Sequence, residues 1–161
     1  MTKEIDCALQ EWEFARSNSV EFIKTLGNDG LKIKLPRPEL DVFCKHFQEM
    51  ISIQKLYINA IKVGEMLFDD MDEEFDGQAT TDDLIKSMNE LDEDLKRAIS
   101  ETDYSLEIKW DGGEIKTISS HLCALSTHEI FHIGQLVAFC YVAGIKLPQE
   151  IVTNWALSPQ E

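Results

Sequence analysis

Four stretches of the sequence repeat their apolar side chains at the spacing of an amphipathic helix, and this periodicity limits the possible folds most strongly. The stretches cover residues 3–26, 40–58, 82–101 and 119–143. Because such helices must bury their apolar faces against one another, the pattern predicts an all-α, antiparallel four-helix bundle. The 161 residues, 43% of them hydrophobic, suffice for one such domain spanning 1–161.

A short β element is predicted between the third and fourth helices. Residues 106–110 and 114–118 alternate apolar and polar side chains around Asp111-Gly112-Gly113, which is typical of a β-hairpin. Two strands alone are barely stable in water, so we expect this hairpin or extended loop to pack on the helices. The tail 145–161 has too weak a pattern to assign beyond one short helix or a docking segment.

The charge of the chain excludes several classes of function. The formal net charge is −15, from 30 acidic against 15 basic residues, and the basic residues form no stripe, so we expect no nucleic-acid partner. The acidic run 69–76 lacks the ligand spacing of a calcium loop and indicates a solvated loop before a helix cap.

Nothing in the sequence suggests a membrane or an oxidising compartment. The first residues lack the apolar core of a signal peptide, and no run approaches the ~20 apolar residues of a membrane span. Four cysteines lie singly in predicted helices, as expected for reduced thiols: Cys7, Cys44, Cys123 and Cys140. We therefore expect a cytoplasmic protein with no membrane partner.

Two histidines four residues apart are the strongest functional signal. On a helix, His132 lies about 40° around and ~6 Å along from His128, so both imidazoles can reach one metal ion. His121 is about 10.5 Å along the axis from His128, too far to join that ion, and is more simply structural. For a bare pair of this kind, two hydrogen-bonded core histidines are an equally simple interpretation.

A third histidine extends this pair into a possible site. His46 belongs to the apolar stripe of the second helix, and a neutral imidazole facing His128 and His132 would complete a three-histidine cradle with room for water or substrate. Glu49 and Gln135 each follow a histidine by about one turn, so they can support a ligand or the bound water, or make ordinary interhelical contacts.

Three other interpretations of these residues are possible. The segment from His128 to His132 also matches HExxH, which would make Glu129 the general base of a zinc protease; the helical phase of Glu129 and the lack of a third ligand count against it. A di-iron bundle would need a second ExxH unit, which the sequence lacks. A non-catalytic interaction or stress-response module with structural histidines is the remaining alternative.

Taken together, these motifs resemble the DinB/YfiT-like superfamily of metalloenzymes. The resemblance rests on His46, on the Lys109-Trp110-Asp111-Gly112-Gly113 turn, and on His128-x-x-x-His132-x-Gly134-Gln135 leading to Gly144 and Pro148. It implies a four-helix bundle that binds a divalent metal, zinc or nickel first, through His46, His128 and His132, and that forms a homodimer.

The resemblance also suggests a range of activities. Relatives include metal-dependent hydrolases and transferases that act on low-molecular-weight thiols such as bacillithiol, so a small-molecule substrate is expected. Ile133 stands where such proteins often carry an arginine, which puts in doubt any substrate contact that this arginine would make.

Overall fold

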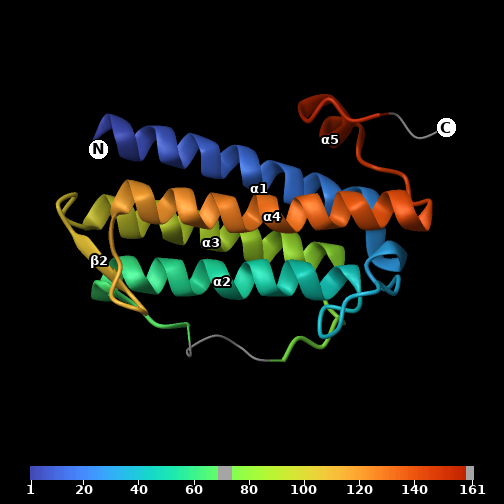
Figure 1. Cartoon of the computed structure of the whole chain (residues 1–161), viewed down its shortest axis with the longest axis horizontal. Helices are drawn as coiled ribbons and strands as arrows, with labels where there is room; N and C mark the ends of the chain where they lie inside the picture. The colour runs from blue at the N-terminus through green and yellow to red at the C-terminus, as the bar shows by residue number, and fades with distance from the viewer. Residues whose placement is uncertain (69–73, 159–161) are drawn as a thin grey trace.

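Four long helices lie side by side in the part of the chain that the structure, a computed structural model, describes: residues 1–68 and 74–158 (Figure 1). They are α1 (Lys3–Gly30), α2 (Phe43–Val63), α3 (Thr81–Glu101) and α4 (Ile118–Ala143). The predicted all-α bundle is confirmed, with boundaries that differ from the predicted ones by a few residues. None of these described helices combines the length and the apolar character needed to cross a bilayer.

The helices form two parallel pairs that run in opposite directions. α1 and α4 run one way and α2 and α3 run the other, as the colour gradient in Figure 1 shows. α2 ends at the end of the bundle that carries the hairpin, whereas α3 begins at the opposite end. The expected antiparallel bundle therefore contains a pair of neighbours, α2 and α3, that run parallel to each other.

Local capping signals explain where the helices begin and end. Gly27 has a φ of 61°, a left-handed value that favours glycine, and it interrupts α1 before a last turn to Gly30. Thr80 and Asp83 form a reciprocal capping box at the start of α3. Gly144 ends α4 in the left-handed conformation with a φ of 66°. Gly27 therefore interrupts α1 one turn before its end, and Gly144 terminates α4.

The predicted hairpin is present and carries one extra strand. β2 (Glu107–Trp110) pairs antiparallel with β3 (Ile115–Thr117), and the two-residue β1 (Glu65–Met66) pairs parallel with β2. A short helix, α5 (Gln149–Asn154), follows α4, as the tail pattern allowed. The predicted acidic loop lies mostly outside the described residues, because 69–73 are not described.

His121 fastens this sheet to the bundle. The indole Nε1 of Trp110 donates to His121 Nδ1 at 3.1 Å, so the other ring nitrogen carries the proton and donates to the Tyr57 carbonyl at 3.0 Å. The His121 side chain is fully buried, and burial lowers its pKa to about 4. Both ring nitrogens are used in structural bonds, which supports the structural interpretation of His121.

The four cysteines are free thiols. Cys44 and Cys140 are buried within the bundle, and Cys7 and Cys123 are exposed. Burial raises the pKa of the Cys140 thiol to about 12, and it also raises that of Cys44. The buried thiols are therefore inert packing groups rather than nucleophiles.

Candidate metal centre

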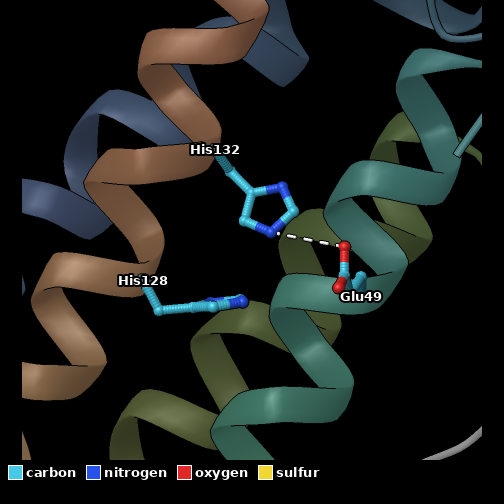
Figure 2. Close-up of side chains that lie close together, drawn as sticks. All are labelled: Glu49, His128 and His132. Carbon is cyan, nitrogen blue, oxygen red and sulfur yellow. Dashed lines mark ion pairs between the residues drawn. The ribbon is translucent and has the colours of Figure 1, made fainter. Parts of the chain in front are cut away.

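Two histidines of α4 and a carboxylate of α2 converge between these helices. His128 and His132 extend from successive turns of α4 toward Glu49 on α2 (Figure 2). One potential ligand atom from each of the three residues lies within 4.8 Å of the others. Glu49 belongs to the first turns of α2, and this part of α2 lies at the end of the bundle opposite the hairpin (Figure 1).

The imidazole of His132 is engaged through both ring nitrogens. Its Nε2 lies 3.3 Å from Glu49 Oε2, the pair joined by the dashed line in Figure 2. Its Nδ1 lies 3.1 Å from Nδ1 of His46, whose side chain is fully buried. His132 thus lies between two residues of α2 that are about one turn apart, and each of them is next to a different ring nitrogen.

The structure brings the histidines and the glutamate that the sequence singled out close together between α2 and α4. The predicted pairing of His128 with His132 is present, because their ring centroids are 4.6 Å apart. His46 reaches His132 but not the group of three, in which Glu49 is the member from α2. The signal for Glu49 was its position one turn after His46 on the same helical face.

All three site histidines are neutral near pH 7. Burial is the main cause, and it lowers the pKa of His46 and His128 to about 4 and that of His132 to about 2. The guanidinium of Arg37 lowers all three further, and His128 and His46 add to the shift at His132. Burial also raises the pKa of Glu49, against the opposing charge of Arg37. Neutral imidazoles are the form that binds metal ions.

Two polar atoms in this group lack a hydrogen-bond partner among the described residues. They are Glu49 Oε2 and His128 Nδ1, both shielded from solvent. An unpaired buried polar atom costs on the order of 1–3 kcal/mol, so native proteins rarely keep one without a reason. Nitrogen and oxygen ligands ~2.0–2.2 Å from a zinc ion lie roughly 3–4 Å apart, so slight closure of this group would satisfy both atoms.

Arg37 acts electrostatically on the three histidines, and no sequence pattern pointed to it. It lies in the loop between α1 and α2, and its guanidinium donates a hydrogen bond to Gln135 Oε1 on α4. Ile133, at the position where the resemblance expects an arginine, is instead buried in the core. Arg37 and Glu49 both line a cavity of about 410 Å³, and Glu49 is the residue that this cavity shares with the group of three. No spacing rule could connect a loop arginine to this cavity.

Glu129 lies in a different environment from its neighbour His128. It is fully buried, pairs with Arg16 Nη1 at 3.0 Å and accepts a hydrogen bond from the Ser19 hydroxyl, both on α1. Arg16 also donates to Gln54 at 2.6 Å and lies 3.5 Å from Asp92. Burial raises the pKa of Glu129, and the Arg16 guanidinium opposes that rise. This placement removes the general base that a zinc protease would need.

Comparison with known proteins supports the fold of the bundle. No family model and no curated protein matches the sequence. Among solved structures, the chain is similar to a DinB-like protein from Bacillus cereus ATCC 10987, with a TM-score of 0.65 and 16% sequence identity. The similarity covers 88% of this chain and 93% of the other. At this level of identity the comparison concerns architecture alone, and by that architecture the chain has a DinB-like fold.

Proposed function

We propose that the protein binds a divalent cation between α2 and α4. The observation that carries the proposal is the convergence of Glu49, His128 and His132, whose potential ligand atoms lie within 4.8 Å of one another. The neutral imidazoles and the two unpartnered atoms at this point support it. Imidazole with carboxylate suits zinc, nickel and other first-row cations, and the metal that the cell supplies decides among them.

His128 and His132 supply two of the proposed ligands, and α2 supplies the third. The geometry favours Glu49, because His132 Nε2 faces its carboxylate at 3.3 Å. In that arrangement His46 holds the other nitrogen of His132 at 3.1 Å and fixes its orientation, as residues behind metal-bound histidines commonly do. The resemblance discussed above instead places His46 on the metal. Variants of the two residues distinguish these ligand sets.

We further infer that the site acts on a small molecule, as a metal-dependent hydrolase or a transferase of low-molecular-weight thiols. A bound divalent cation supplies Lewis acidity, which makes a water molecule or a thiol nucleophilic near neutral pH. The chain provides a cavity of about 410 Å³, a size that suits a small substrate. Arg37 borders that cavity and can orient the substrate, while Gln135 holds its guanidinium in place.

Calorimetric titration of zinc into metal-free protein tests the binding site. The parent should bind one ion per chain, and His128→Ala should weaken binding at least about a hundredfold, because one of three ligands is lost. Glu39→Gln is the matched control, since Glu39 lines the same cavity outside the group of three, and it should leave affinity within about threefold. Equal zinc affinity in the parent and in His128→Ala would refute the proposal.

The same titration assigns the ligand from α2. If Glu49 is the ligand, Glu49→Gln should cost about as much affinity as His128→Ala, whereas His46→Ala should cost about 10–100-fold as the loss of an orienting partner. If His46 is the ligand, the order of the two effects is reversed.

A further inference from the structure

Arg37 is near the Glu49 carboxylate, where its charge opposes the rise in pKa that burial causes, but it forms no ion pair with any carboxylate that the structure describes. Its guanidinium is half-buried and is held by the neutral amide of Gln135. The neighbouring Lys45, by contrast, pairs with Asp41 at 2.9 Å. A guanidinium has five N–H donors, and the bond to Gln135 uses only one of its nitrogens. Arg37 therefore retains donors that a ligand could use.

The cavity beside Arg37 changes its charge balance when a cation binds. Among the described residues, its lining carries two basic side chains, Arg37 and Lys45, and three acidic ones, Glu39, Glu49 and Glu74. This balance is slightly negative, in a chain whose overall charge is −15. A divalent cation at Glu49 would reverse the sign of the lining, and low-dielectric walls concentrate such a field within the cavity.

We propose that Arg37 recognises a carboxylate group of the small molecule that enters this cavity, and that it does so once a divalent cation is bound. The inference rests on the proposed metal site and specifies the class of substrate. The planar fork of a guanidinium matches a carboxylate in a bidentate pair. A phosphate dianion fits less well, because its second charge would face the remaining carboxylates Glu39 and Glu74. The bond from Gln135 fixes Arg37 in place before the ligand arrives.

Two thiols of similar size test this inference on cobalt-loaded protein. 3-Mercaptopropionate carries a carboxylate and 2-mercaptoethanol is neutral, and binding of either to cobalt is followed by thiolate-to-cobalt absorption. The measured quantity is the ratio of the two dissociation constants, compared between the parent and Arg37→Gln. The parent and Arg37→Gln hold the same ion, so any direct contact of the carboxylate with cobalt affects both ratios equally and cancels when they are compared.

In the parent, the preference for 3-mercaptopropionate should exceed that of Arg37→Gln by at least about tenfold, the value of one charge-assisted pair. Arg37→Lys should keep part of the preference, because it keeps the charge but loses the fork. Lys45→Gln is the matched control; Lys45 is a cation of the same cavity already paired with Asp41, and its loss should change the ratio less than threefold.

The outcomes separate this inference from the proposed metal site. A parent that takes up no cobalt would refute the metal site and the inference together. A cobalt-loaded Arg37→Gln protein with the preference of the parent would refute only the role of Arg37. An equal loss in Lys45→Gln would also refute it, because a general field and not a contact would then select the anion. A cobalt-loaded parent that binds neither thiol would refute the inference but not the metal site, because the cavity would then not reach the ion.

Discussion

Replacing Glu129 tests whether this residue is structural or catalytic. In the structure its carboxylate is fully buried, 3.0 Å from Arg16 Nη1, and it accepts the hydroxyl of Ser19. Glu129→Ala would leave the guanidinium with Gln54 at 2.6 Å, Asp92 at 3.5 Å and the face of the Trp12 ring at 4.6 Å. Removal of one partner from a buried ion pair costs about 3–5 kcal/mol. Glu129→Gln keeps an acceptor and should cost less, about 1–3 kcal/mol.

Urea denaturation of metal-free protein measures these losses, and zinc titration of the same variants measures the site. We expect reduced stability in both variants and a zinc affinity in Glu129→Gln within about threefold of the parent. Glu13→Gln is the matched control, because the exposed Glu13–Lys96 pair at 3.1 Å should contribute less than about 1 kcal/mol. The double variant Arg16→Met/Glu129→Leu should recover much of the loss, because the remaining charge, Asp92, still accepts hydrogen bonds from Trp12 at 3.1 Å and Gln54 at 2.8 Å.

Two results would contradict this account of Glu129. One is a Glu129→Gln protein as stable as the parent, which would mean that the buried pair does not hold α1 to α4. The other is a loss of zinc binding equal to that of His128→Ala, which would place Glu129 at the metal.

Three further predictions concern pH, the sheet and association. Burial lowers the pKa of the site histidines to about 4 or below in the folded protein, whereas the same histidines have a pKa of ~6.5 in the unfolded chain, which therefore binds more protons below pH 6.5. Urea titrations of the metal-free protein should show the free energy of unfolding falling from pH 6.5 toward 4, by at most ~1.4 kcal/mol per pH unit for each histidine. A free energy that does not change over this range would contradict the prediction. Trp110→Phe removes the donor to His121 Nδ1 and should destabilise the protein by about 1–3 kcal/mol without changing zinc affinity, and a lost zinc site would show that His121 serves the metal. We propose that the outer face of α4, where Phe131 and Val142 are 65% and 83% exposed, joins two copies of the chain; light scattering should give a dimer that Phe131→Glu dissociates, and a monomeric parent would refute this.

Periodicity was enough to predict the helices, because burying an amphipathic face leaves few alternatives. The predicted stretches 3–26 and 119–143 end just before Gly27 and Gly144, and both glycines adopt left-handed conformations that break helical geometry. β1 was not predictable, because two residues are too short to carry an alternating pattern. The parallel course of α2 and α3 depends on the long connection between them, for which no local signal exists.

The site was predictable only where its members share one helix. His128 and His132 are four residues apart on α4, so helical geometry alone brings them together. Whether His46 or Glu49 completes the group depends on the rotation of α2 about its own axis, which decides which side chain of its first two turns faces α4. Helical spacing does not determine that rotation. The role of Arg37 depends on a loop that reaches Gln135, a contact between positions far apart in the sequence.

Metal content measured by mass spectrometry on purified, tag-free protein tests the central claim most directly. We predict close to one divalent ion per chain in the parent, and almost none in the His128→Ala/His132→Ala double variant, which lacks both ligands from α4. Urea denaturation of the double variant should confirm that it is folded. A parent that carries no metal and takes up neither added zinc nor added nickel would contradict the claim, as would a folded double variant that retains its ion.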